Sequence, residues 1–104
     1  MNIVVTSRHM SVPEDFRQKA EAKVEKLERY FDSLQSVELT LDHEADQATV
    51  EILAVAKHKT QFIATARDGD LNVALDQCVH KVSEQIRRHK DKVRDHQGVP
   101  HGDR

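Results

Sequence analysis

The chain has 104 residues, of which 33% are charged and 4% aromatic, and its formal net charge is -2. A chain of this length forms one domain, and its single cysteine, Cys78, excludes an intrachain disulfide. The segment Met1–Val5 lacks the basic region and the long apolar run of a signal peptide. No apolar stretch is long enough to cross a bilayer, so we expect a cytoplasmic protein with no membrane partner.

A strand and a helix are predicted in the first third of the chain. The β-branched residues of Asn2–Arg8 indicate a strand. Ser11 and Glu14 have the spacing of a capping box, and we expect a helix from there to about Phe31. Apolar residues recur in this helix at intervals of three and four, which places them on one face: Phe16, Ala20, Val24, Leu27 and Phe31.

Three further strands are predicted in the middle of the chain. Apolar and polar residues alternate through Val37–Asp42, through Ala48–Val55 and through Gln61–Arg67. This alternation is the period of a half-buried strand. Because the connections between the three segments are short and polar, we expect an antiparallel meander.

The last predicted element is a long helix from Leu71 to about Arg94, with Asp70 as its N-cap. Residues 96–104 contain almost no apolar side chain, so we expect a folded domain over residues 1–95 followed by a disordered tail. The element order β-α-β-β-β-α predicts an α+β fold in two layers. A four-stranded, mostly antiparallel sheet would carry both amphipathic helices on one face.

Positive charge is segregated along the sequence. No lysine or arginine occurs between Tyr30 and Ala56, a stretch that contains six acids. The bases gather instead in the two predicted helices. Because the local field decides whether a polyanion can dock, the small net charge does not exclude one.

The helical bases form stripes when they are placed at about 100° per residue. On the first helix the stripe is Lys19, Lys23, Lys26 and Tyr30, and on the last helix the two stripes are Lys81, Arg88, Lys92 and Arg87, Lys90, Arg94. A solvated face with ion pairs four residues apart would explain the first stripe. From Lys81 to Arg94, six bases meet only two acids, so anion binding and a solvated face both remain open there.

Catalytic and metal-binding motifs are missing from the sequence. No pair among the seven histidines has the HExxH spacing, and there is no Cys-x-x-Cys. Cys78 falls on the apolar face of the last helix, where we expect a core residue. We therefore expect no metal, no cofactor, no small-molecule substrate and no enzymatic activity.

Three segments resemble the ribosome hibernation-promoting factors, a family also called ribosome-associated inhibitors or sigma-factor modulation proteins. They are Lys23–Asp32 (KVEKLERYFD), Ala64–Asp76 and Gln85–Val93, and the resemblance extends in order from Met1 to about His96. The resemblance implies the β-α-β-β-β-α sandwich, which is similar to double-stranded RNA-binding domains. It also implies the short form of the family, without a C-terminal dimerisation domain.

The same resemblance implies a function and a set of contacts. The expected partners are the small ribosomal subunit and the intact ribosome, chiefly ribosomal RNA in the channel for messenger RNA and tRNA. The expected factor is a monomer when free, inhibits translation, and preserves idle ribosomes under stress or in stationary phase. The implied RNA-binding residues are Lys23, Lys26, Arg29, Tyr30, Lys81, Arg87, Arg88, Lys90 and Lys92, with Lys19, Lys57, Lys59, His89 and Arg94 as weaker candidates. The alternative is a non-ribosomal RNA-binding or protein-interaction module.

Overall fold

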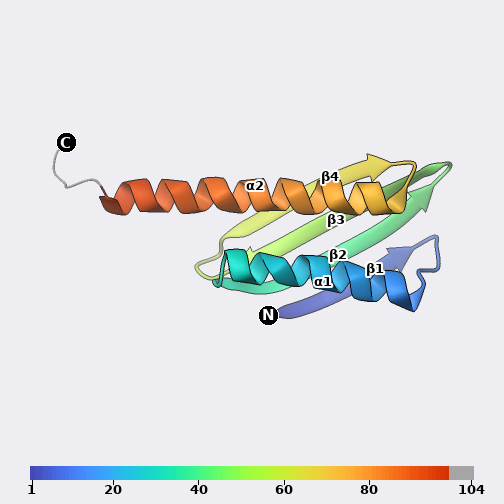
Figure 1. The fold of residues 1–104 in the computed structure, drawn as a ribbon, viewed down its shortest axis with the longest axis horizontal. Helices are drawn as coiled ribbons and strands as arrows, with labels where there is room; N and C mark the ends of the chain where they lie inside the picture. Colours follow the sequence, from blue (N-terminus) through green and yellow to red (C-terminus); the bar gives the residue numbers. More distant parts are fainter. Residues whose placement is uncertain (99–104) are drawn as a thin grey trace.

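Two helices lie side by side on one face of a four-stranded sheet (Figure 1). The computed structural model describes the backbone of residues 1–98 and the side chains of residues 1–92. The elements are β1 (Asn2–Arg8), α1 (Glu14–Tyr30), β2 (Leu34–Glu44), β3 (Gln47–Ala56), β4 (Gln61–Asp68) and α2 (Leu71–Gly98). The predicted element order is confirmed.

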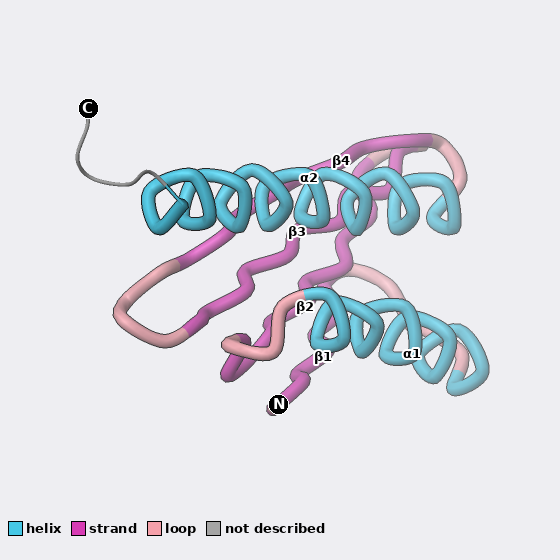
Figure 2. Tube along the Cα trace, turned by 60° about the vertical axis from the view of Figure 1, so that its left-hand side comes forward, coloured by secondary structure: helices cyan, strands magenta, loops and turns pink. Residues whose placement is uncertain are grey.

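The strands follow one another across the sheet in the order β1-β2-β3-β4. β1 pairs with β2 in parallel, and the other two pairs are antiparallel. Parallel neighbours need a crossover connection, and α1 provides it. Figures 1 and 2 both show α1 and α2 on the same side of the sheet, which confirms the predicted two-layer fold.

The core lies between the sheet and the helices. Alternate strand residues are buried there, and each helix adds its apolar face. The fully buried larger side chains are Val24 of α1, Val37, Leu39, Leu41, Val50 and Ile52 of the sheet, and Leu75, Cys78, Val82 and Ile86 of α2. Cys78 is a core residue as predicted, and burial raises the pKa of its thiol to about 11. It therefore stays protonated and unreactive near neutral pH.

The two helices begin differently from each other. Asp70 caps α2 as predicted, since its Oδ1 accepts the backbone N–H of Asn72 at 2.8 Å. The predicted capping box of Ser11 and Glu14 is wrong, because the N-cap of α1 is Pro13, whose side chain makes no capping hydrogen bond. Ser11 lies before this extended proline, outside the position from which a cap can act.

The end of α2 also differs from the expectation. The helix continues to Gly98, past the predicted end near Arg94 and into the first residues of the predicted tail. The rest of that tail, residues 99–104, lies outside the described residues. α2 is consequently much longer than the strands beneath it, and Figure 1 shows its C-terminal part extending beyond the sheet.

Candidate nucleic-acid interface

A groove of about 430 Å³ separates α1 from α2 near the C-terminal end of α1. Its lining is Lys23, Lys26, Leu27, Arg29 and Tyr30 of α1 with Asp76, Val79 and Ser83 of α2. Leu27 is buried and Val79 is half-buried, so the groove combines an apolar surface with cationic side chains. The helix register places these residues together, because both helices bury the neighbouring apolar faces in the same core.

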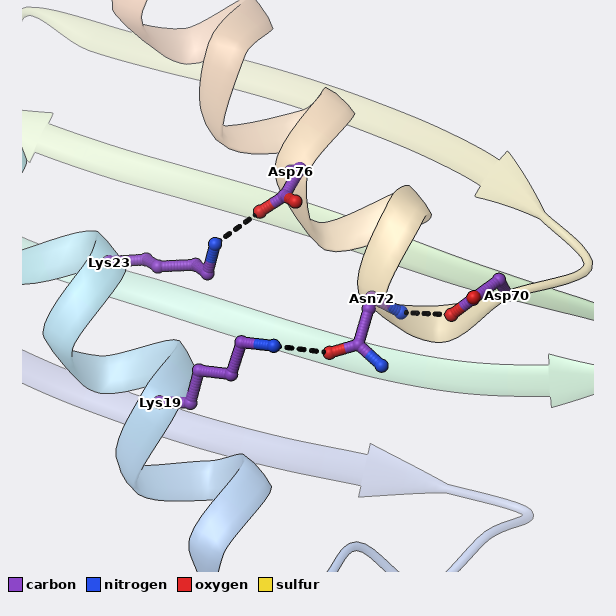
Figure 3. A network of polar contacts seen from close by, with 5 residues as sticks. All are labelled: Lys19, Lys23, Asp70, Asn72 and Asp76. Atoms are coloured by element: carbon purple, nitrogen blue, oxygen red, sulfur yellow. Dashed lines mark hydrogen bonds and ion pairs between the residues drawn. The ribbon is translucent and has the colours of Figure 1, made fainter.

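Two lysines of the predicted α1 stripe bridge to α2 (Figure 3). Lys19 Nζ donates to Asn72 Oδ1 at 2.8 Å, and Lys23 Nζ lies 2.5 Å from Asp76 Oδ1. The Lys23 side chain is 29% exposed, and its charge is balanced locally by Asp76. A phosphate that approaches Lys23 would have to compete with this carboxylate.

Asp76→Asn provides a test of this competition. The substitution removes one negative charge beside the groove, and we expect binding to a short test RNA to strengthen by about two- to fivefold at low salt. Stability should change by less than ~1 kcal/mol, because an exposed ion pair contributes little. Filter binding at two salt concentrations measures the effect, with Glu38→Gln on the other face of the sheet as the control. Equal affinities for Asp76→Asn and the wild type would contradict the competition.

Lys26 and Arg29 differ from the bridging lysines. Both are exposed and line the groove, and neither side chain makes an ion pair with any other described residue. Arg29 also lies in the last turn of α1, where the helix dipole favours a cation. These two side chains are the α1 cations that can accept a phosphate without breaking another contact.

Tyr30 is fixed in place by α2. Lys90 Nζ donates to the backbone oxygen of Tyr30 at 2.7 Å and lies 5.0 Å from the centre of its ring. The tyrosine remains 39% exposed. A cation over an exposed ring stabilises by roughly 0.5–1 kcal/mol, so Lys90 orients the ring as well as contributing charge.

The remaining α2 bases fall into two groups. Arg87 contacts Glu84 at 2.6 Å and Asp91 at 3.7 Å, and Lys81 Nζ donates to the Thr65 backbone oxygen of β4 at 2.7 Å. Arg88 and Lys92, by contrast, are exposed and make no ion pair within the described part of the chain. Arg88 lines a second hollow, on the β4 side of α2. Cations free to bind phosphate therefore lie on both flanks of α2.

The Glu84–Arg87 pair predicts a pH dependence. The hydrogen bond from Arg87 lowers the pKa of Glu84 below its ordinary value. A carboxyl group whose pKa is lowered by folding stabilises the folded state when the pH is above its ordinary pKa. This stabilisation is lost as the pH falls through the lowered pKa. In an NMR titration we expect Arg87→Gln to raise the Glu84 pKa toward normal. An unchanged Glu84 pKa in this variant would show that the ion pair does not form in solution.

The weaker candidates lie in different environments. The His89 ring is half-buried and packs edge-on at 5.6 Å from both Phe31 and Phe62. His89 lies seven and three residues along the helix from the buried Val82 and Ile86, so it falls on the same face. This spacing indicates burial, and the sequence prediction overlooked it. Lys57 and Lys59 are exposed on the β3–β4 turn, and the side chain of Arg94 lies outside the described residues.

A metal site and a membrane-spanning helix are both missing from the described part of the chain. Within residues 1–92, no group of three or more His, Cys, Asp or Glu side chains could hold a metal ion. Neither of the helices described has the length and apolar character needed to cross a membrane. The groove and the cations beside it remain the chemically distinctive surface.

Residues 3–94 match the family described as Sigma 54 modulation protein / S30EA ribosomal protein. The chain belongs to this family. The match covers nearly all of the described structure, from β1 through the basic part of α2. The family predicted from the three sequence segments is therefore confirmed.

Curated members of the S30EA family align with the chain over most of its length. The ribosome hibernation promoting factor of Escherichia coli K12 is 30% identical over 100 residues, which cover 92% of this chain and 100% of that protein. The factor of the same name from Azotobacter vinelandii is 26% identical and covers 88% of this chain and 85% of its own length. Both relatives carry the name ribosome hibernation promoting factor, which agrees with the family predicted from the sequence.

Two solved structures share the fold. The N-terminal domain of Thermus thermophilus Protein Y has a TM-score of 0.77 and 25% identity, and the match covers 86% of this chain and 99% of that domain. A ribosomal subunit interface protein from Coxiella burnetii has a TM-score of 0.81 at 18% identity, covering 88% of this chain and 99% of that one. The second likeness shows the fold alone. Together they indicate that the two-layer S30EA fold is retained at low sequence identity.

Proposed function

We propose that this chain is a ribosome hibernation factor. It binds the small ribosomal subunit, alone or in the intact ribosome, in the channel that messenger RNA and tRNA occupy. Occupation of that channel inhibits translation and preserves idle ribosomes under stress or in stationary phase. The free protein is a cytoplasmic monomer. Family membership supports the ribosome as the partner, and the unpaired cations on both flanks of α2 support RNA as the contact.

The mechanism is steric occlusion held by phosphate contacts. Lys26 and Arg29 lie on one flank of α2, with Arg88 and Lys92 on the other, and all four are exposed. Each neutralised phosphate releases counterions, so four contacts give a slope of about −3 to −4 in a plot of log affinity against log salt. No residue needs to act as an acid, base or nucleophile for this function.

Charge also decides which face meets the RNA. Glu38 and Glu51 are exposed on the sheet, and their alternation with the buried Leu39 and Ile52 places them on the face opposite the helices. These two carboxylates repel a phosphate backbone from the part of the outer face that they occupy. In the proposed complex the helices therefore face the RNA and the outer face of the sheet points away from it.

Sedimentation with separated ribosomal particles tests the proposal. The purified chain is mixed with small subunits, large subunits or intact ribosomes and centrifuged through sucrose at low salt. We expect comigration with small subunits and intact ribosomes, together with inhibition of translation in a cell-free system. Comigration with large subunits alone, or with none of the particles, would contradict the proposed function.

A further inference from the structure

We propose that the groove between α1 and α2 receives one unpaired nucleotide of the bound RNA. The base lies against the apolar lining of the groove, and the phosphate faces Lys26 and Arg29. This inference rests on the proposed function for the identity of the ligand as RNA. The proposed groove site adds a contact to one base, whereas the other proposed contacts are only to phosphates.

The lining of the groove has the composition that a nucleotide requires. Val79 is half-buried and lines the groove beside Leu27, which is 2% exposed, so Val79 offers most of the apolar surface to the face of a base. Ser83 adds a hydroxyl that can hydrogen-bond to a base edge, and Lys26 and Arg29 add the positive charge. The volume of about 430 Å³ lies within the roughly 300–1,000 Å³ of small-ligand sites.

Contacts between the helices lie at both ends of the α1 segment that lines the groove. At one end Lys23 and Asp76 approach to 2.5 Å, as Figure 3 shows. At the other end Lys90 donates to the Tyr30 backbone oxygen at 2.7 Å. The eight residues of α1 from Lys23 to Tyr30 span about 10 Å, because the helix rises 1.5 Å at each of the seven steps between them. A space of this length suits a single unstacked nucleotide better than a continuous helical strand.

Tyr30 provides an aromatic surface beside this space. Tyr30 lines the groove, and Lys90 Nζ lies 5.0 Å from the centre of its ring. Unpaired RNA bases characteristically stack on aromatic side chains and hydrogen-bond through their edges. A base-paired duplex cannot present a base in this way, so the groove should distinguish a bulged RNA from a fully paired one.

The test compares two RNA hairpins that differ only by one bulged nucleotide. We expect the full chain to bind the bulged hairpin about tenfold more tightly, the effect of one stacked base. Ser83→Leu fills the groove without changing charge, and it should abolish this preference by weakening binding of the bulged hairpin. Ser7→Leu, the same change at an exposed position of β1, should retain the preference. A wild type that does not prefer the bulge, or a folded Ser83→Leu that still does, would overturn the proposal.

A second measurement requires no variant. In methyl NMR spectra of the wild type, adenosine 5′-monophosphate should shift the resonances of Leu27 and Val79 in the groove. The resonances of Val4, which is 44% exposed outside the groove, should not move. Absent or equal shifts would overturn the nucleotide site. Neither experiment contains a ribosome, so failure here is distinguishable from failure to comigrate with the small subunit.

Discussion

Reversing the charge of Lys26 and Arg29 together should abolish stable binding to the small ribosomal subunit. Both side chains are exposed, line the groove, and have no ion-pair partner among the described residues. The Lys26→Glu/Arg29→Glu variant loses two phosphate contacts and places two carboxylates against the RNA. We expect affinity near 0.1 M salt to fall by about 100-fold or more, with a shallower salt dependence. Sedimentation with small subunits over a salt series measures both quantities.

The matched control carries the same charge change on the opposite face of the sheet. Arg8 and Arg67 are both exposed, and the strand register places them in one row with Asp42 and Thr49. Arg8→Glu/Arg67→Glu should retain binding within a few-fold, because only the long-range field changes. Equal losses in the two variants would show that net charge, and not the helical surface, governs binding.

Removing the ring of Phe62 should cause one of the largest losses of stability available to a single substitution. Phe62 is 5% exposed, and its ring packs edge-on at 6.0 Å from Phe31 and 5.6 Å from His89. This cluster joins β4 to the end of α1 and to α2. Phe62→Ala should lower the free energy of unfolding by about 3–5 kcal/mol through lost burial and a residual cavity. Urea unfolding followed by circular dichroism measures the change.

Ile63 provides the comparison within the same strand. Its side chain is 54% exposed on the outer face of the sheet, so Ile63→Ala should cost less than about 1 kcal/mol. In addition, Phe62→Ala should weaken RNA binding at temperatures where it is still folded, because the cluster holds residues adjacent to Tyr30 and Lys90. Similar stability losses for the two variants would contradict the packing described here.

The fold was predictable because the hydrophobic period changes sharply along the chain. Apolar residues are spaced three and four apart in the first helix, alternate with polar residues from Val37, and are again three and four apart from Leu71. These changes set the number and type of the elements. The start of α1 was less predictable, since a local motif at Ser11 competed with Pro13 for the cap. Propensity and spacing do not decide such a competition between adjacent residues.

The candidate site was predictable only as a set of bases. Helical phase placed Lys23, Lys26 and Tyr30 on one edge, but it does not reveal which residues of another helix lie opposite. Asp76 is 53 residues from Lys23 in the sequence, and only tertiary packing brings them together. The structure thus divides the predicted helical bases into those that contact the other helix, β4 or an acid of α2 and those whose side chains are free to bind phosphate.

The most direct test is a structure of this chain bound to the small ribosomal subunit. We predict that the helical face lies in the messenger RNA and tRNA channel, with Lys26 and Arg29 near phosphates on one flank of α2 and Arg88 near phosphates on the other. The outer face of the sheet should point away from the RNA. A complex in which Glu38 and Glu51 face the RNA, or in which the chain binds outside the channel, would contradict this prediction.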